Sequence, residues 1–280
     1  MLTTRLIPCI LLKNGLIVRS EQFAYHQNLG DPIHQVRRYT EWQVDELVYL
    51  DISRDEQYDL RRDDHKIKGL TGILDILSAV SEHCFVPLAF GGRIRTLEDI
   101  TQRLRRGADK VVINTQALRR PAFIAEAAGV FGSQCIVLSI DAKRRAEGVY
   151  EVCADGGRTP MRIDPVQWAR EAEALGAGEI LLNSIDRDGM AQGYDLELIR
   201  SVVEAVDIPV IACGGAGTFE HFVSGVTEGR ADAVAAANLF QFTEHSYPRA
   251  KKRLQAAGVS VRVVGFAAPP ARLGTLASHG

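Results

Sequence analysis

The stretch CIVLSIDAKRR at residues 135–145 begins with a short apolar run that leads directly to a carboxylate, Asp141. An apolar run of this length without polar alternation is typical of a strand that is buried on both faces, as in parallel sheets. A second stretch, CILLKNG at residues 9–15, matches it when Ile10-Leu11-Leu12-Lys13 is set against Ile140-Asp141-Ala142-Lys143. The two strand ends therefore repeat, except that Leu11 stands where the other copy has Asp141.

Similar apolar runs recur along the chain and alternate with longer stretches of helical periodicity. The apolar runs are LIPCILL at 6–12, ELVYLDI at 46–52, VPLAF at 86–90, KVVIN at 110–114, CIVLSI at 135–140, EILLNSI at 179–185, VIACG at 210–214 and DAVAAAN at 232–238. Several helical stretches open with Asp, Thr or Pro and close with Gly, which is the usual start and stop chemistry of helices. The pattern predicts an α/β protein with a single (β/α)8 TIM barrel.

The barrel is expected to consist of two repeated halves. Gly91-Gly92 precedes Asp109 by 18 residues, and Gly214-Gly215 precedes Asp232 by the same distance. We place the barrel at residues 1–266, with half-barrels at about 1–133 and 134–266, and predict a disordered tail at 267–280. The first half also carries an insertion at 53–66, rich in charge, which we interpret as a solvated loop.

Composition excludes several functional classes. The chain is 46% hydrophobic and 24% charged with a net charge of −2, so no nucleic-acid partner is expected. We expect no membrane span, and the five cysteines, without a C-x-x-C pair, predict reduced thiols in a cytoplasmic protein. The spacing of the seven histidines suits no metal, and no Cys or Ser has an activating partner. We therefore predict no metal, no cofactor and no covalent nucleophile.

Chemistry is expected at the carboxyl ends of the strands, where TIM barrels place their active sites. Glycine pairs at 91–92 and 214–215, each followed one strand later by Asn114-Thr115 or Ala237-Asn238, suggest two phosphate sites on opposite sides of the barrel mouth. The alternative is that the glycines only form tight turns. The acids at this face, Asp51, Asp141, Asp186 and Asp188, are candidates for proton transfer, for binding a hydroxyl group or for pairing with Lys143 or Arg187.

The opposite ends of the strands carry two cations and two anions. Arg5, Glu46, Lys110 and Glu179 stand at the starts of the first, second, fourth and sixth strands. They are positioned to form a ring around the barrel axis, and charges on this face ordinarily serve stability.

Several motifs resemble one family closely. RLIPCILLKNG at 5–15, GADKVVINTQAL at 107–118 and GAGEILLNSIDRDGMAQGYDLELI at 176–199 are similar to the cyclase subunit of imidazole glycerol phosphate synthase, and the likeness runs from residue 1 to about 266. The resemblance implies a barrel of two half-barrels that binds a ligand with a phosphate at each end. It also implies that a glutaminase subunit docks on the N-terminal barrel face and that Arg5, Glu46, Lys110 and Glu179 form the entrance for ammonia.

The family uses two aspartates for ring closure, and this chain keeps only one. Asp141 matches the second aspartate, whereas Leu11 occupies the position of the first. Loss of one general acid–base partner typically costs about 10²- to 10⁴-fold in rate. Other departures are Arg93 for a glycine, Met190 for a threonine and Asn238 for a serine. The ligand-binding set implied by the resemblance is Arg19, Asp51, Gly92, Arg93, Asn114, Thr115, Asp188, Gly189, Gly214, Gly215, Ala237 and Asn238.

The LLKNG sequence at 11–15 is closest to a paralogous branch associated with acetamidino modification of surface-polysaccharide sugars. In that branch the barrel and its glutaminase supply ammonia to a separate sugar amidotransferase. The preferred interpretation is therefore an ammonia-channelling barrel, with Leu11 apolar because cyclisation is no longer its task. Two alternatives are an active histidine-pathway cyclase and a scaffold that binds a phosphorylated effector and activates the glutaminase.

Overall fold

Eight parallel strands form a closed barrel in the computed structural model, which describes residues 3–54, 58, 70–242 and 245–262. Pairing between the first and last strands, and between the fifth and sixth, completes the closure. The barrel strands are, in order, β1 (Arg5–Lys13), β4 (Leu47–Asp51), β5 (Leu88–Gly91), β6 (Lys110–Ile113), β7 (Ile136–Ala146), β10 (Glu179–Ser184), β11 (Val210–Cys213) and β12 (Ala233–Ala236). Every apolar run of the sequence forms one of these strands, so the predicted (β/α)8 barrel is confirmed.

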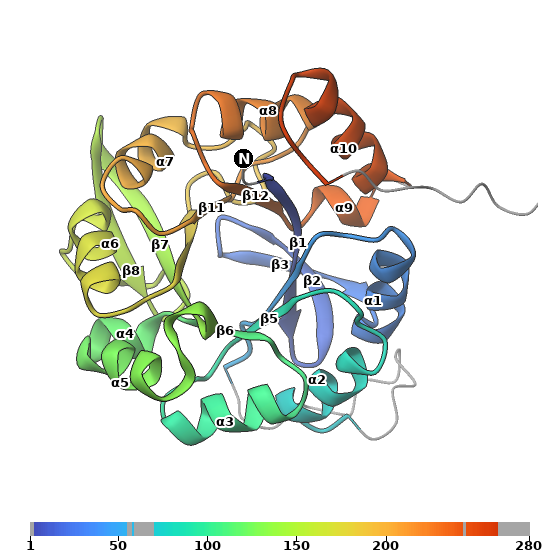
Figure 1. Cartoon of the computed structure of the whole chain (residues 1–280), viewed down its shortest axis with the longest axis vertical. Coiled ribbons are helices and arrows are strands. Elements are labelled where there is room, and N and C mark those ends of the chain that lie inside the picture. Colours follow the sequence, from blue (N-terminus) through green and yellow to red (C-terminus); the bar gives the residue numbers. More distant parts are fainter. Residues whose placement is uncertain (1–2, 55–57, 59–69, 243–244, 263–280) are drawn as a thin grey trace, which may run out of the picture.

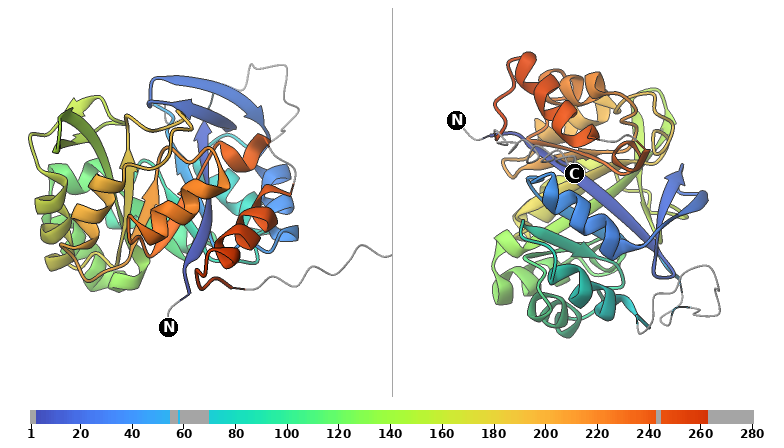
Figure 2. Two further views of the ribbon diagram at one scale, coloured as in Figure 1. Left: turned by 90° about the horizontal axis from the view of Figure 1, so that it is seen from above. Right: turned by 90° about the vertical axis from the view of Figure 1, so that its right-hand side faces the viewer.

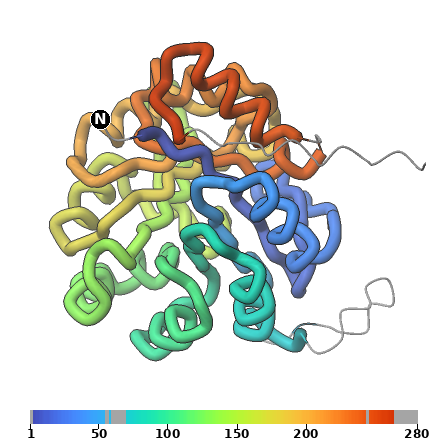
Figure 3. Tube along the Cα trace, turned by 45° about the vertical axis from the view of Figure 1, so that its right-hand side comes forward, coloured from blue at the N-terminus to red at the C-terminus, as the bar shows by residue number. Residues whose placement is uncertain are grey.

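In the described part of the chain, eight helices of two turns or more surround the barrel. Figure 1 shows them on the outside of the strands. They are α1 (Pro32–Glu41), α2 (Ile73–Ser81), α3 (Leu97–Arg105), α5 (Ala122–Phe131), α6 (Pro165–Ala174), α7 (Leu196–Val203), α8 (Phe219–Thr227) and α10 (Ser246–Ala256). Side-chain caps start several of them; Asp31, for example, accepts a hydrogen bond from the Ile33 N–H. The tube in Figure 3 shows the helices following one another around the barrel in chain order.

Smaller elements follow two of the barrel strands and precede a third. Short helices α4 (Thr115–Arg119) and α9 (Leu239–Phe242) come directly after β6 and β12, and a 3-10 turn η1 (Ser133–Cys135) precedes β7. The sequence patterns did not predict α4 or α9. Both follow strand ends that the repeat relates to each other, so the two halves share this detail.

Two antiparallel extensions rise from the mouth of the barrel. β1 continues into β2 (Leu16–Glu21) and β3 (Tyr25–Gly30), and β7 continues into β8 (Val149–Ala154) and β9 (Thr159–Pro160). Figure 2 shows both extensions at the end of the barrel opposite the N-terminus. We call β2–β3 the first hairpin and β8–β9 the second hairpin. They leave equivalent strands of the two halves.

The barrel interior is built in layers because alternate residues of a strand point inward. The inward positions form an apolar cluster that is separate from the larger core between barrel and helices. Its members are Ile7, Cys9, Leu11, Val18, Val48, Ala89, Val112, Val137, Leu181, Ile211, Cys213, Ala233 and Ala235. All five cysteines are free thiols, in agreement with the sequence-based expectation.

Two predictions fall largely outside the described residues. The tail at 267–280 lies there entirely, and of the insertion at 53–66 only Ser53, Arg54 and Tyr58 are described. Among the residues that are described, no helix is both long and apolar enough to cross a bilayer.

Candidate functional site

Asp141 lies at the mouth on the inward face of β7, two residues beyond Ser139 and four beyond Val137 of the interior cluster. Its carboxyl accepts a hydrogen bond from Asn114 Nδ2 at 2.8 Å and is 6% exposed as a residue. Burial raises the pKa of Asp141 to about 7, although hydrogen bonds from Asn114 and Ser139 oppose the shift. A carboxyl that titrates near neutrality is suited to accept and return a proton.

Leu11 lies on the inward face of β1, on the opposite side of the barrel from Asp141. It pairs in register with Leu50 of β4 and Val18 of β2, and it belongs to the interior cluster with 8% exposure. An aliphatic side chain exchanges no proton. Of the two repeat-related positions 11 and 141, only the second thus carries an acid.

Asp188 and Gly189 lie in the loop after β10 and contact the first hairpin. Asp188 accepts hydrogen bonds from Ser20 Oγ at 2.6 Å and from the Phe23 N–H at 3.3 Å. Burial raises the pKa of Asp188, while these hydrogen bonds lower it. A Cβ on Gly189, at φ +71°, would lie 2.1 Å from the Ser20 carbonyl oxygen. The hairpin therefore lies directly against this loop.

Asn238 and Arg19, both predicted to bind ligand, make contacts that hold the first hairpin. Asn238 Nδ2 donates to the Ser20 carbonyl at 2.9 Å, and the Ser20 N–H donates to Asn238 Oδ1 at 3.4 Å. Arg19 forms an ion pair with Glu21, and its guanidinium lies 5.9 Å from the centre of the Phe242 ring. The amide of Asn238 thus pairs with the hairpin backbone much as a neighbouring strand would.

The glycine pairs allow close approach of neighbouring loops. A Cβ on Gly215, at φ +110°, would lie 2.2 Å from the Gly193 carbonyl oxygen, and one on Gly214 would lie 2.7 Å from that of Ser184. Gly92, also at φ +110°, would place a Cβ 2.5 Å from the Asp51 carbonyl oxygen. Tight packing alone explains these glycines, and anion binding at them remains a proposal.

Polar groups on the other side of the mouth contact one another. Arg93 Nη2 lies 3.3 Å from Asp51 Oδ2, and Thr115 Oγ1 accepts a hydrogen bond from the Asp155 N–H at 2.9 Å. Asn114 contacts Asp141, as described above. Asp186 accepts a hydrogen bond from the Arg144 N–H at 2.7 Å, so it serves the base of the second hairpin. The structure therefore brings together Asn114 with Asp141 and Arg93 with Asp51.

Sequence reasoning missed several side chains of the mouth. Asn183 also hydrogen-bonds Asp141, and Ser20 and Tyr58 contact Asp188 and Asp51, respectively. Asn183 alone carried a usable signal, because it ends an apolar run two residues after the inward-facing Leu181. Ser20 and Tyr58 lie in a hairpin and a loop that apolar periodicity does not identify.

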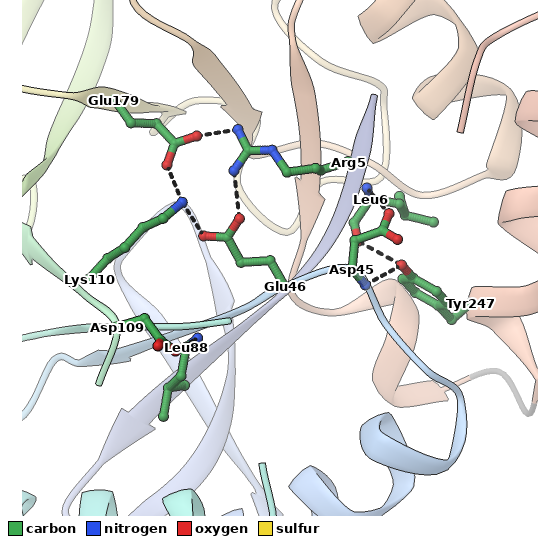
Figure 4. A network of polar contacts seen from close by, with 9 residues as sticks. All are labelled: Arg5, Leu6, Asp45, Glu46, Leu88, Asp109, Lys110, Glu179 and Tyr247. Atoms are coloured by element: carbon green, nitrogen blue, oxygen red, sulfur yellow. Dashed lines mark hydrogen bonds and ion pairs between the residues drawn. The ribbon is translucent and has the colours of Figure 1, made fainter. Parts of the chain in front are cut away.

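At the opposite end, Arg5, Glu46, Lys110 and Glu179 form a closed ring of ion pairs (Figure 4). Lys110 Nζ lies 2.9 Å from a carboxylate oxygen of each glutamate, and Arg5 pairs with Glu46 at 2.5 Å and with Glu179. The four residues occupy inward positions two residues before Ile7, Val48, Val112 and Leu181. Alternation along the strands thus places the ring directly beneath the apolar interior.

Opposite charges stabilise the ionised state of the ring. Burial acts to lower the pKa of Lys110, but the neighbouring Glu46 and Glu179 carboxylates outweigh it and raise that pKa. The same balance raises the pKa of Arg5. The glutamate side chains are only 2% and 7% exposed, so each depends on both cations for compensation.

Among the described residues, no group of three or more His, Cys, Asp or Glu side chains is arranged to hold a metal ion. A family model described as "Histidine biosynthesis protein" matches residues 5–246. The matched range contains all eight barrel strands, the charged ring and every residue of the predicted mouth.

Proposed function

The chain belongs to the histidine biosynthesis protein family, and on this premise we propose that it is the ammonia-accepting barrel of a glutamine amidotransferase complex. A glutaminase subunit would dock on the N-terminal face and release ammonia at the charged ring. The ammonia would cross the barrel to the mouth and serve the conversion of an acetamido to an acetamidino group on a surface-polysaccharide sugar. A separate sugar amidotransferase would carry out that last step.

The charged ring is the observation that carries this proposal. Charges that served stability alone would pair equally well on the outer surface, whereas these four side chains pair with one another at the starts of four different barrel strands. Ammonia is small and uncharged in its free-base form. It can therefore enter an interior lined by Ile, Val, Leu and Ala without the large desolvation cost that a charged group would have. For ammonia to pass, the Lys110 or Arg5 side chain must temporarily break its ion pairs with Glu46 and Glu179.

The mouth favours transfer of ammonia over ring closure. Asp141 retains a pKa suited to proton exchange, but Leu11 contributes only apolar surface opposite it. Arg93 and Asn238 contact Asp51 and the first hairpin in this structure. These contacts support a mouth that differs from that of a cyclase.

The decisive experiment couples glutamine hydrolysis to amidination in the reconstituted complex. Lys110→Met is expected to reduce the fraction of glutamine-derived ammonia that reaches the acceptor, while transfer from added ammonium salt persists. Lys251→Met is the matched control, because Lys251 pairs with Asp45 on the same face but outside the ring. If Lys110→Met changes only glutaminase stimulation and leaves transfer intact, the barrel is a scaffold and not a conduit.

A second candidate is an active imidazole glycerol phosphate synthase cyclase. The pKa of Asp141, raised to about 7 by burial, favours this candidate because one residue of that pKa serves as acid and then as base. Complementation of a histidine auxotroph that lacks the cyclase distinguishes the two. Robust growth would establish the cyclase and overturn the proposed role in amidination.

A further inference from the structure

A pocket of about 460 Å³ lies between the base of the first hairpin, α1 and α9. Figure 1 shows these elements on the same side of the barrel. We call it the hairpin pocket. Its size is within the ordinary range of small-molecule sites. It is distinct from the mouth, because its described lining contains no residue of the interior cluster and none of the ligand-binding set implied by the resemblance.

Part of the wall of the hairpin pocket is apolar. Ile17 and Leu29 contribute to it from the two strands of the first hairpin, and Phe242 contributes from the end of α9. Phe242 is 59% exposed, which is unusual for an aromatic side chain beside a pocket. An apolar ligand body against this wall would remove that surface from water and would join the hairpin to α9.

The rest of the wall includes one polar face of α1. Its side chains come from positions with the spacing i, i+3, i+4 and i+7, which lie on one side of a helix: Asp31, His34, Gln35 and Arg38. Gln35 is only 7% exposed, and its Nε2 is covered by protein without a hydrogen bond of normal geometry to a described residue. Buried polar groups nearly always have a hydrogen-bond partner, so Gln35 lacks one that a ligand can provide.

The Gln35 amide has a second orientation in which it would serve a ligand. Burial raises the pKa of Tyr39, while Arg38 and the Gln35 amide oppose the shift, so the neutral Tyr39 hydroxyl lies beside the amide. That hydroxyl already accepts a hydrogen bond from Gln241 Nε2 at 3.2 Å, and its own hydrogen has no described acceptor. Exchanging the two ends of the Gln35 amide lets Tyr39 donate to Oε1 and gives Nε2 the uncovered position of Oε1.

Arg38 adds a fixed positive charge to the same wall. Its Nη2 donates to the Phe240 carbonyl at 2.9 Å, and its guanidinium lies 5.0 Å from the centre of the Trp42 ring. These contacts hold the side chain, but no carboxylate among the described residues forms an ion pair with it. Its Nε is covered, so Nη1 is the nitrogen that a ligand would reach. A held guanidinium without a counter-ion favours an anion, and a carboxylate fits its geometry.

Asp31 restricts the ligand at the other end of the helix face. It is the N-cap of α1 and accepts a hydrogen bond from the Ile33 N–H at 2.7 Å. It precedes Arg38 by seven residues, which is about 10 Å along a helix. A ligand with one carboxylate can place it beside Arg38, whereas a second carboxylate at the far end would approach the like charge of Asp31.

We propose that the hairpin pocket is a second ligand site, which binds a monocarboxylate with an apolar body. The carboxylate pairs with Arg38 and accepts a hydrogen bond from Gln35. The body packs against Ile17, Leu29 and Phe242, so the ligand holds the base of the first hairpin to α1 and α9. Because that hairpin contacts the mouth, the ligand acts on the mouth from outside it. This inference does not depend on the proposed function.

Calorimetric titration of the full chain with octanoate, octanol and suberate tests the ligand class. Octanoate is expected to bind at one site, and octanol, which lacks the charge, about 10- to 100-fold more weakly. Suberate carries a second carboxylate at the far end of a chain of the same length and should bind about 3- to 10-fold more weakly than octanoate. Asp31→Asn keeps a helix cap without the charge, so it should abolish the discrimination against suberate.

Two substitutions in α1 test the residues that would hold the carboxylate. Arg38→Met keeps an apolar stem beside Trp42 and should weaken octanoate binding about 10- to 100-fold. Arg37→Met is the matched control, because Arg37 is exposed on the same helix and lies outside the pocket; it should leave the affinity unchanged. Gln35→Leu removes the unpartnered amide and should weaken octanoate about 3- to 10-fold, which keeps the test decisive if Arg38→Met fails to fold.

Hydrogen exchange identifies the element that the ligand holds. Octanoate should slow amide exchange in the first hairpin, including Leu29, and leave β8 of the second hairpin unchanged. Absence of octanoate binding would overturn the proposal, as would equal affinity for octanol. Equal losses in Arg38→Met and Arg37→Met, or protection of β8 in place of the first hairpin, would show that the ligand binds elsewhere and would also overturn it.

Discussion

Lys110→Met should destabilise the barrel by an amount that follows from its contacts. Removing one partner of a buried ion pair costs about 3–5 kcal/mol. Here the lysine side chain is 22% exposed, and Glu46 and Glu179 each keep Arg5. Discounting for that exposure and for the remaining cation, we expect a loss of about 2–3 kcal/mol in the free energy of unfolding.

The pH dependence of this loss has a definite sign. The pKa of Lys110 in the folded chain lies above the ordinary lysine value of 10.5, so its contribution to stability is complete below that pH and is lost as the pH rises through the folded value. The difference in the free energy of unfolding between the native chain and the Lys110→Met variant should therefore be constant from about pH 7 to pH 9. It should become smaller above about pH 10.5. Urea denaturation followed by circular dichroism at several pH values measures it.

Controls separate the charge effect from packing. Lys110→Met/Glu179→Gln removes one charge of each sign and should recover part of the lost stability, because Glu46 and Arg5 then form a balanced pair. A loss below about 1 kcal/mol, or one that the second substitution does not reduce, would show that the ring is not the buried, mutually dependent network described above.

Three further substitutions test the mouth. Gly189→Ala adds a Cβ 2.1 Å from the Ser20 carbonyl oxygen at φ +71°, so it should displace the first hairpin and accelerate limited proteolysis within residues 16–30. Asn238→Ala removes both hydrogen bonds to Ser20 and should cost about 1–2 kcal/mol, with faster amide exchange at Ser20 but not in β8. Asp141→Asn should stabilise the chain at pH 8 by about 2–4 kcal/mol, because burial raises the pKa of Asp141 to about 7 and penalises its charged form. That gain should disappear by about pH 4, where the carboxyl is protonated in the folded chain and about half protonated in the unfolded chain. A gain that did not change with pH would contradict the raised pKa of Asp141.

The sequence was sufficient to predict the barrel because burial on both faces produces apolar runs that are easy to recognise. The charged ring was predictable for a related reason: Glu46 and Glu179 start strands whose inward positions follow from alternation. The resemblance to the family added the proposed role of the ring, which strand position alone left as a stabilising feature.

The hairpins were missed although one of them carries a local signal. Asn14-Gly15, with φ values of +52° and +80°, is the residue pair that favours a two-residue hairpin turn, but β3 lacks the apolar alternation by which strands are recognised. The pairing of Asp51 with Arg93 was not predictable, since it depends on a left-handed backbone at Arg93 and on a tyrosine in the insertion. The hydrogen bonds between Asn238 and Ser20 were not predictable either, because they depend on the path of the first hairpin.

The two hairpins make the mouth asymmetric although the two halves of the barrel repeat. The second hairpin is anchored outward, where Arg144 and Tyr150 contact the buried Asp195 at the start of α7. The first hairpin instead contacts the mouth, where Ser20 donates a hydrogen bond to Asp188. The two hairpins thus have different anchors, and the surroundings of Asp141 differ on the two sides of the mouth although the halves of the barrel repeat.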